Sequence, residues 1–264
     1  MDSMVSVPSV YLKKMDTSMS TKVTPPVSII FRGSDDPGHY VWSPFVTKLE
    51  FRLRLAGIPY RIGAGNPWLG PKGKIPYVEL AADTGAGPTM LGDSTLITKH
   101  LIESSALDDL NGGLTSAEKT RDLAIRALLE DKLYFYHMRE CWLDNYYVQR
   151  DKALASVPFP MRILIGQSVH RKVKRTLYGQ GAGRYTDAEI DAFRTEIWSS
   201  LNDMLSGVRA YAQSSTVNQE GNSEVAMGRE PFWCLGGEEP TEADVTLLAL
   251  SQVGWLLRGT SLLI

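Results

Sequence analysis

The sequence is short of the residues from which disulfide-bonded and metal-bound frameworks are built. Its 264 residues include two cysteines, Cys141 and Cys234, and four histidines. Two thiols are too few for a disulfide framework, and their separation along the chain does not match a zinc motif. The histidines form no His-x-x-x-His pair. We therefore expect no metal site.

Long apolar runs and an excess of one charge are also missing. No stretch approaches the roughly 20 consecutive apolar residues that span a bilayer. The formal net charge of −2 gives no whole-chain attraction to nucleic acid. Residues 1–26 are rich in Ser, Thr and Met and lack arginine, which favours a flexible tail over an organelle-targeting segment. We expect a cytoplasmic protein, with organelle association as the alternative.

What the sequence does contain is an alternation of strand and helix patterns between residues 27 and 105. VSIIFRG predicts a buried strand, Ser43 and Pro44 open a helix that Gly57 ends, and PYRIGA predicts a second strand. Apolar residues of that helix recur at the helical spacing: Phe45, Leu49, Leu53 and Ala56. Two short strands joined through AADTGAGPTML follow, and Gly92-Asp93-Ser94 begins a further helix. This order is thioredoxin-like.

Helical patterns replace strand patterns in the second half of the chain. We expect helices at 116–147, 160–177, 187–213 and 242–257, and a polar loop at 214–230. The first helix carries one stripe, formed by Leu123, Ala127, Glu130, Tyr134, His137 and Cys141. Thr241 caps the last helix, and Asp244 completes a box-like start. The predicted fold class is an α/β thioredoxin-like N-terminal domain, 27–106, plus an all-α C-terminal domain, 114–264.

Three features of the first domain have a binding interpretation beside a purely structural one. A proline that opens a strand, as in Ile75-Pro76, leaves the preceding N–H and C=O available to an extended ligand, whereas a plain strand edge is the alternative. The helix start at Asp93-Ser94 favours an anion through its N–H groups and dipole. Ser43 opens the earlier helix, where the dipole and the hydroxyl would stabilise a thiolate brought in by a ligand. A simple N-cap is the alternative for both helix starts.

A resemblance joins these features. SPFVTKLEFRLRLAGIPYRI, GKIPYVEL and LGDSTLITKHL resemble the N-terminal domain of the glutathione S-transferase superfamily, in the branch of the metaxin and failed-axon-connections proteins. EDKLYFYHMRECWLDN, RKVKRTLYGQGAGRYTDAEI and PTEADVTLLAL resemble the helical domain of that branch. The resemblance covers residues 27 to 257. It implies a glutathione S-transferase-like fold, glutathione as the cofactor and a homodimer.

The resemblance also implies roles for single residues in glutathione binding. The peptide before the strand proline is cis in these proteins and its backbone pairs with the cysteinyl unit, which maps to Ile75 and Pro76. An acidic residue followed by serine holds the γ-glutamyl end, which maps to Asp93 and Ser94. The residue that opens the first helix faces the sulfur, which maps to Ser43. Either Lys72 or Lys74 meets the glycyl carboxylate.

The resemblance implies a second-substrate pocket between the domains, lined by the first part of the long helix. Its candidates are Tyr134, Tyr136, His137, Arg139 and Trp142. Because helical periodicity cannot place all five on one face, we expect about half of them in the core or the domain interface. GQGAGRY follows a basic helix and no strand, so it predicts an inter-helix turn in which Arg184 makes structural contacts, not a dinucleotide site.

These features predict a glutathione-dependent transferase. Ser43 and the helix dipole would lower the thiol pKa, and the thiolate would attack a small electrophilic organic substrate or serve its isomerisation. Val46 stands where relatives often carry a cysteine, which argues against a disulfide reductase. The alternative is a non-catalytic, metaxin-like protein that associates with other proteins. Retention of Asp93-Ser94 favours the transferase, and loss of the cysteine favours the alternative.

Overall fold

The computed structural model describes residues 27–36, 38, 41–80, 88–155, 157–217 and 232–258. Three predicted segments lie outside the described residues: the tail at 1–26, the turn at 81–87 and the part of the polar loop at 218–230. The chain divides into two compact units between Asp108 and Asp109. None of the described helices combines the length and the hydrophobicity that crossing a membrane requires.

The first unit contains a four-stranded mixed sheet in the order β2-β1-β3-β4. Its strands are β1 (Val27–Phe31), β2 (Arg61–Gly63), β3 (Tyr77–Leu80) and β4 (Thr89–Gly92). Strand β1 pairs in parallel with β2, and β3 is antiparallel to both β1 and β4. Two parallel strands need a crossover connection, which is usually a helix, between β1 and β2. The β-α-β order predicted for residues 27 to 64 is confirmed.

That crossover is helix α1 (Pro44–Leu55), which begins and ends where the sequence predicts. Pro44 is tolerated at the first helical position because its missing N–H would have no helical partner there. At the other end Gly57 has a φ of +67°. The N–H of Gly57 bonds to the carbonyl of Arg54 at 3.1 Å, and that of Ile58 to the carbonyl of Leu53 at 2.9 Å. These two bonds form a Schellman motif, which ends the helix.

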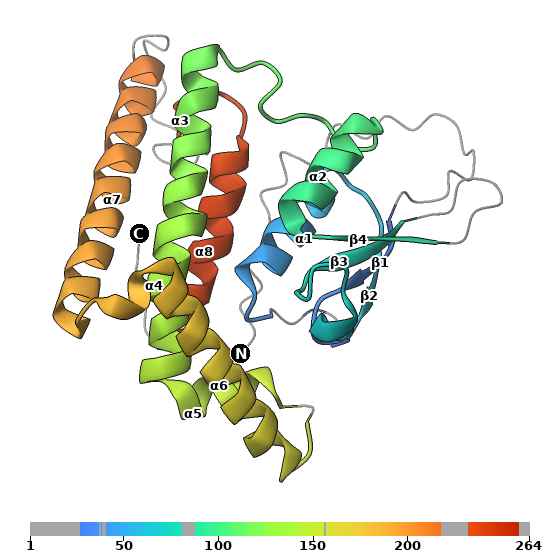
Figure 1. Ribbon diagram of the computed structural model, residues 1–264. Helices are drawn as coiled ribbons and strands as arrows, with labels where there is room; N and C mark the ends of the chain where they lie inside the picture. The colour runs from blue at the N-terminus through green and yellow to red at the C-terminus, as the bar shows by residue number, and fades with distance from the viewer. Residues whose placement is uncertain are drawn as a thin grey trace, which may run out of the picture. The chain divides into compact units, whose positions relative to one another are not determined.

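Helices α1 and α2 (Ser94–Glu103) lie side by side against one face of the sheet (Figure 1). The core between them is made of buried residues from the strands, from both helices and from the following turn: Val27, Ile30, Leu49, Leu53, Val78, Leu80, Ile97, Leu101 and Leu107. Burial of each large aliphatic side chain contributes about 1.5–3 kcal/mol relative to leaving it in water. The connection from β2 to β3 includes a short 3-10 helix, η2 (Pro67–Leu69).

Helix α1 also buries charged side chains, which the apolar spacing did not predict. Glu50 pairs with Arg32 at 3.1 Å, and the guanidinium of Arg52 donates to the carbonyl of Asp108 at 2.6 Å. Burial raises the pKa of Glu50, and the nearby Arg32 offsets part of that shift. These polar contacts fix the orientation of α1, because a buried charge must keep its partner.

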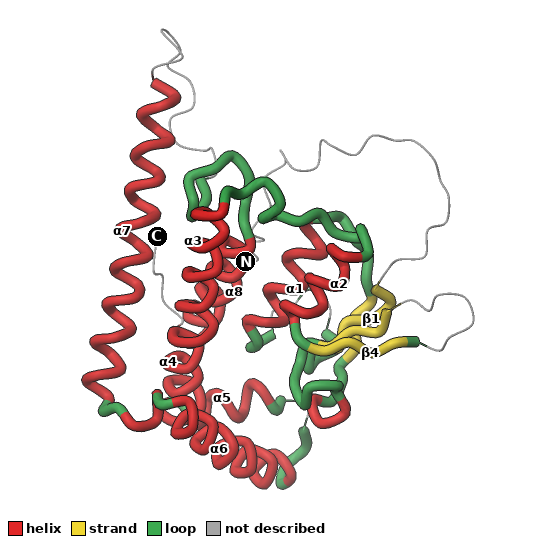
Figure 2. The backbone as a smooth tube through the Cα atoms, turned by 45° about the horizontal axis from the view of Figure 1, so that its top comes forward, coloured by secondary structure: helices red, strands yellow, loops and turns green. Residues whose placement is uncertain are grey.

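The second unit is helical (Figure 2). Its elements are α3 (Ser116–Ala127), the π-helical turn η3 (Leu128–Leu133), α4 (Tyr134–Arg139), the π-helical turn η4 (Glu140–Asp144), α5 (Tyr146–Ala153), α6 (Met161–Gln180), the 3-10 turn η5 (Ala182–Arg184), α7 (Asp187–Val217) and α8 (Glu242–Arg258). The predicted helices at 160–177, 187–213 and 242–257 are confirmed, although α7 runs four residues into the predicted loop. Helix α5 extends beyond the predicted end at residue 147.

The single stripe expected along 116–147 is wrong. Leu123 is 58% exposed, whereas Cys141 is 4% exposed, so the two do not share a buried face. The reason is the pair of π-helical turns, η3 and η4, which interrupt the regular α-helical hydrogen bonding. A π turn adds a residue per turn, and every position after it is rotated relative to an ideal α-helix.

Two polar clusters hold the start of α8. The carboxylate of Asp244 accepts hydrogen bonds from the backbone and hydroxyl of Thr241, each at 2.8 Å. This contact bears out the predicted box-like start. The second cluster centres on Asp122 of α3, which is fully buried and accepts from the N–H of Ala243 at 2.7 Å. Helix α8 is thereby tied to α3 by a bond that no sequence motif indicated.

Candidate functional site

A small cavity in the first unit collects side chains from three separate segments. Its lining is Phe45, Lys72, Lys74, Ile75, Pro76, Asp93 and Ser94. The cavity has a volume of about 50 Å³. Because a single water needs roughly 10–15 Å³ of such volume, the space holds one small polar group or a few waters. A longer ligand would lie mostly over its mouth.

Ile75 and Pro76 form the rim that leads into β3. The Ile75–Pro76 peptide is cis, as the resemblance implied. Within the described part of the chain, neither the N–H nor the C=O of Ile75 makes a hydrogen bond. Gly33, with φ of +90°, lets the Ile75 side chain approach, because a Cβ there would stand 2.9 Å from Ile75 Cδ1. The backbone of Ile75 is therefore held in place and available to an extended ligand.

Asp93 and Ser94 form the opposite wall at the start of α2. The backbone N–H of Asp93 donates to the carbonyl of Pro76 at 3.2 Å, which connects the two walls. Asp93 has a φ of +87°, and a residue other than glycine in this region is strained by about 1–3 kcal/mol. Its Oδ1 accepts the N–H groups of Thr95 and Leu96 at 3.0 and 3.2 Å. Asp93 thus caps α2, as the structural alternative proposed.

Ser94 has no such structural task. Its side chain lines the cavity and the residue is 3% exposed. Among the described residues no group forms a hydrogen bond with the Ser94 hydroxyl or with Asp93 Oδ2. The hydroxyl oxygen of Ser94 is open to the cavity, where water or a ligand reaches it. A donor and an acceptor are therefore available side by side at the positive end of the α2 dipole.

Ser43 occupies the N-cap position of α1, but its hydroxyl does not cap the helix. Its backbone is extended, and its carbonyl accepts the N–H groups of Val46 and Thr47 at 3.1 and 3.2 Å. The hydroxyl has no hydrogen-bond partner in the described part of the chain. Ser43 is therefore the N-cap by position, as predicted, but its side chain makes no cap hydrogen bond. Ser43 itself does not line the cavity, whereas Phe45, two residues further on, does.

The role of Phe45 was missed by sequence reasoning, which assigned it to the core stripe of α1. The buried stripe begins instead at Val46 and continues through Leu49 and Leu53. The spacing of three and four residues in that set is the signal that would have found it. Both lysines that the sequence left as alternatives, Lys72 and Lys74, line the cavity.

The aromatic candidates for a second-substrate pocket pack within the helical unit. Tyr136 is buried and stacks on Phe193, with ring centroids 5.9 Å apart. Tyr134 contacts Phe135 edge to face, and burial raises its pKa to about 12. The carbonyl of Trp142 accepts a hydrogen bond from the ring of His170 at 2.9 Å. These contacts are structural.

The two remaining candidates make polar contacts. His137 lies 3.5 Å from both the Cys141 thiol and the Glu140 carboxylate. Arg139 donates to the carbonyl of Tyr185 at 2.8 Å and pairs with Asp187. None of the five candidates lines the cavity of the first unit. Their second-substrate role stays a prediction.

The predicted role of GQGAGRY as an inter-helix turn is confirmed. The stretch contains η5, between α6 and α7. The guanidinium of Arg184 lies 4.9 Å from the centre of the Tyr178 ring, a cation–π contact. Arg184 therefore makes the structural contact that the sequence predicted.

Comparison with known proteins agrees with this architecture. A model of the family described as glutathione S-transferase N-terminal domain matches residues 44–147, a span that includes all the residues that line the cavity. The structure is similar to that of the glutathione transferase GSTFuA3 from Phanerochaete chrysosporium, with a TM-score of 0.50 and 16% identity. That match covers 86% of this chain and 84% of the other. The predicted fold class is confirmed.

Proposed function

We propose that the protein uses its glutathione transferase fold to bind glutathione and to add the glutathione thiolate to small electrophilic organic molecules. The observation that carries the proposal is the set of polar atoms without partners at one cavity. They are the backbone N–H and C=O of Ile75, Asp93 Oδ2 and the Ser94 hydroxyl. These atoms are open at the cavity, where water or a ligand can satisfy them.

The charges that surround the cavity fit glutathione. The tripeptide carries an ammonium and a carboxylate at its γ-glutamyl end and a second carboxylate on glycine. Asp93 Oδ2 accepts from an ammonium, and Ser94 at the start of α2 donates to a carboxylate. Lys72 and Lys74 supply positive charge for the second carboxylate. The backbone of Ile75 pairs with the peptide between them in the manner of an added strand.

Ser43 is the residue that we assign to the thiol. Bound glutathione supplies a nucleophilic sulfur, which is reactive as the thiolate. The hydroxyl of Ser43 donates a hydrogen bond to that sulfur, and the N-terminal dipole of α1 favours its negative charge. Ser43 and α1 therefore lower the thiol pKa and raise the thiolate fraction at neutral pH. The same stabilised thiolate would serve conjugation and isomerisation alike.

Isothermal titration with reduced glutathione tests the binding step. We expect wild type to bind, and Ser94→Ala to bind at least about tenfold more weakly, since hydrogen bonds to charged groups contribute about 1.5–3 kcal/mol. The matched control is Ser116→Ala, because Ser116 is exposed and also occupies the first position of a helix, α3. This variant should bind like wild type. Absence of binding to wild type at millimolar glutathione would contradict the proposal.

A truncated ligand tests whether the γ-glutamyl group binds at the wall formed by Asp93 and Ser94. The dipeptide Cys-Gly lacks the γ-glutamyl group that we place at Asp93 and Ser94. It should bind more weakly than glutathione, and its affinity should not change in Ser94→Ala. If Ser94→Ala weakens both ligands equally, the γ-glutamyl group does not lie at this wall.

The thiol step has its own readout. Ser43→Ala should leave the affinity for glutathione within about twofold and raise the pKa of the bound thiol, measured by the ultraviolet absorbance of the thiolate against pH. The rate of conjugation with an aryl halide at neutral pH should fall in parallel. An unchanged thiol pKa would remove Ser43 from this role.

The small volume of the cavity favours a second candidate, a non-catalytic protein of the metaxin-like type that binds other proteins. At about 50 Å³ the cavity encloses only one end of a tripeptide. This candidate predicts a folded protein that shows no glutathione affinity in the titration. A homodimer and a cytoplasmic location are proposals that rest on the resemblance and on composition. Sedimentation at several concentrations tests the dimer, and a tagged full-length chain tests the location.

A further inference from the structure

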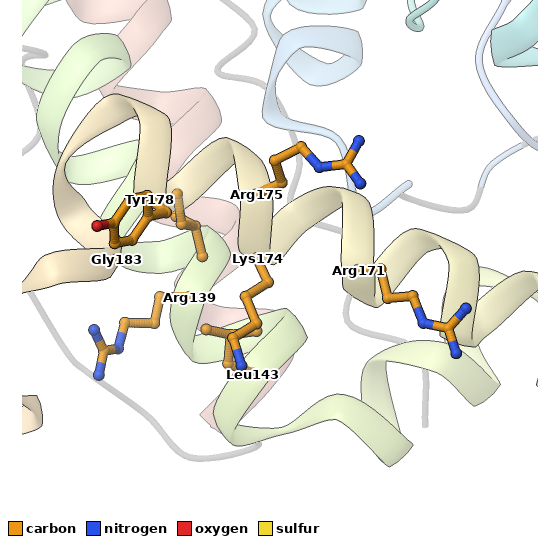
Figure 3. Close-up of a pocket in the computed structure, with 8 residues that line it drawn as sticks. Arg139, Leu143, Arg171, Lys174, Arg175, Tyr178 and Gly183 are labelled. Atoms are coloured by element: carbon orange, nitrogen blue, oxygen red, sulfur yellow. The ribbon is translucent and has the colours of Figure 1, made fainter.

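A larger cavity lies in the helical unit, between α6, the turn η5, the end of α4 and the turn η4. It has a volume of about 520 Å³, within the range of roughly 300–1,000 Å³ that is typical of small-molecule sites. Its lining is Arg139, Leu143, Arg171, Lys174, Arg175, Leu177, Tyr178 and Gly183 (Figure 3). It shares no residue with the cavity of the first unit.

The cations along this cavity have no acidic counterparts on their own helix. Helix α6 carries five Arg and Lys residues and no Asp or Glu. Arg171, Lys174 and Arg175 stand at positions i, i+3 and i+4, within about one turn of α6. All three are exposed, and none makes an ion pair within the described residues. Three uncompensated positive charges therefore border the cavity.

Arg139 differs from these three. It is held by Asp187 and by the carbonyls of Ala182 and Tyr185. Burial raises the pKa of Asp144, and the positive charge of the nearby Arg139 offsets part of that shift. Arg139 therefore forms part of the frame of the cavity, and its charge is already neutralised.

The floor of the cavity is apolar. Leu177 is fully buried and Leu143 is half-buried. Figure 3 shows Lys174 reaching from α6 toward Leu143, while the guanidinium groups of Arg171 and Arg175 project away from the helix. Gly183 brings the backbone of η5 against α6, since a Cβ there would lie 2.8 Å from the backbone nitrogen of Tyr178. The turn thus closes one end of the cavity.

We propose that this cavity binds a phosphate monoester that carries an apolar group. The apolar group would lie on Leu143 and on the exposed ring of Tyr178, and the phosphate would lie among Arg171, Lys174 and Arg175. A dianionic phosphate has three terminal oxygens and suits three separate donors, whereas a carboxylate is satisfied by one arginine. Long exposed arginine side chains retain the rotamer freedom to turn toward such a ligand.

Titration calorimetry with octyl phosphate, kept below its micelle concentration at constant ionic strength, tests the site on the full chain. Octanol, octanoate and inorganic phosphate each lack one part of the proposed ligand. We expect each to bind at least about tenfold more weakly than octyl phosphate, a difference of about 1.4 kcal/mol. Equal affinity for octanoate and octyl phosphate would overturn the assignment to phosphate.

Two single substitutions on the same helix separate a site from general attraction to a basic surface. Lys174→Gln removes a cation that lines the cavity, and Lys172→Gln removes an exposed cation that does not. Both remove one charge from an exposed side chain of α6. We expect Lys174→Gln to weaken octyl phosphate about tenfold and Lys172→Gln to weaken it less than twofold. Equal losses in the two variants would overturn the proposal.

A vesicle experiment identifies the source of the phosphate. Phosphatidylcholine vesicles with phosphatidic acid present the same monoester on a lipid. Cosedimentation that depends on Lys174 but not on Lys172 assigns a lipid headgroup, and binding of octyl phosphate alone assigns a soluble ester. Either result supports the site. The experiment is independent of glutathione, because Ser94→Ala should change none of these affinities.

Discussion

Asp122 provides the strongest single test of how the helical unit is held together. Its carboxylate is fully buried. Oδ1 accepts the N–H of Ala243 at the start of α8, at 2.7 Å. Oδ2 accepts from Asn111 Nδ2 at 2.8 Å and from Arg126 Nε at 2.7 Å. One side chain therefore connects α3 to the start of α8 and to the turn that precedes α3.

The expected loss of stability in Asp122→Ala follows from the groups that lose their hydrogen-bond acceptor. The N–H of Ala243 is buried and loses its acceptor, which costs about 1–3 kcal/mol. Arg126 loses its ion pair, although water reaches this partly exposed side chain and reduces the loss. Removal of one partner of a buried pair costs about 3–5 kcal/mol in total. For a unit of this size each kcal/mol lowers Tm by about 2–4 °C, so we expect a fall of roughly 6–20 °C.

Thermal unfolding followed by circular dichroism measures this change. Asp122→Asn should be nearly as harmful, because an amide has one oxygen and one NH2, and in either orientation the NH2 meets a donor. The matched control is Asp203→Ala, an exposed aspartate of α7, for which we expect a change within about 0.5 kcal/mol. A Tm for Asp122→Ala close to that of the control would refute the reasoning.

Two further predictions concern ionisable groups. Burial raises the pKa of the Cys141 thiol from 9.0 to about 12, so the folded chain keeps a proton that the unfolded chain releases. The free energy of unfolding should therefore fall as pH rises from 9 toward 12, and it should fall less in Cys141→Ala than in wild type. A thiol reagent at pH 8 should label Cys141 only after denaturation. At the start of α7, the backbone and hydroxyl of Thr186 donate to Glu189 and lower its pKa. Thr186→Ala should lower Tm by a few degrees at neutral pH. This difference should shrink as the medium is acidified below the usual pKa of glutamate, because protonation of Glu189 removes the bond; an undiminished difference in acid would contradict the assignment.

The local signals in the sequence were sufficient for α1 and for the strands β1 and β3. Pro44 and Gly57 bound α1 in the structure as they do in the sequence, because the missing N–H of proline and the positive φ of glycine act within a single turn of chain. The strand pattern of residues 27–31 and 77–80 was likewise read from apolar runs. Such features depend on neighbours a few residues away, which the sequence displays directly.

The helix at 116–147 shows where this reasoning fails. The apolar spacing there assumes an ideal α-helix, and two π-helical turns change the phase of every later residue. Leu123, before the turns, is exposed, and Cys141, after the first turn, is buried, so the two do not share a face. Whether a helix accommodates a π turn depends on the packing around it, and that packing cannot be predicted from any single residue type.

The sequence by itself determined the order of the strands and helices of the first unit and the two ends of α1, because these follow from local backbone chemistry. It also singled out Ile75-Pro76 and Asp93-Ser94 as residues with a binding interpretation. Only the tertiary structure decided that these two pairs line one cavity. It also decided that the Ser43 hydroxyl does not cap α1. Of the next residues, Phe45 lines the cavity and Val46 is buried in the core. The tertiary structure also placed Arg171, Lys174 and Arg175 above an apolar floor. The physical reason is that a hydrogen-bond partner or a cavity wall is supplied by residues distant in sequence, and their positions exist only after the chain has packed.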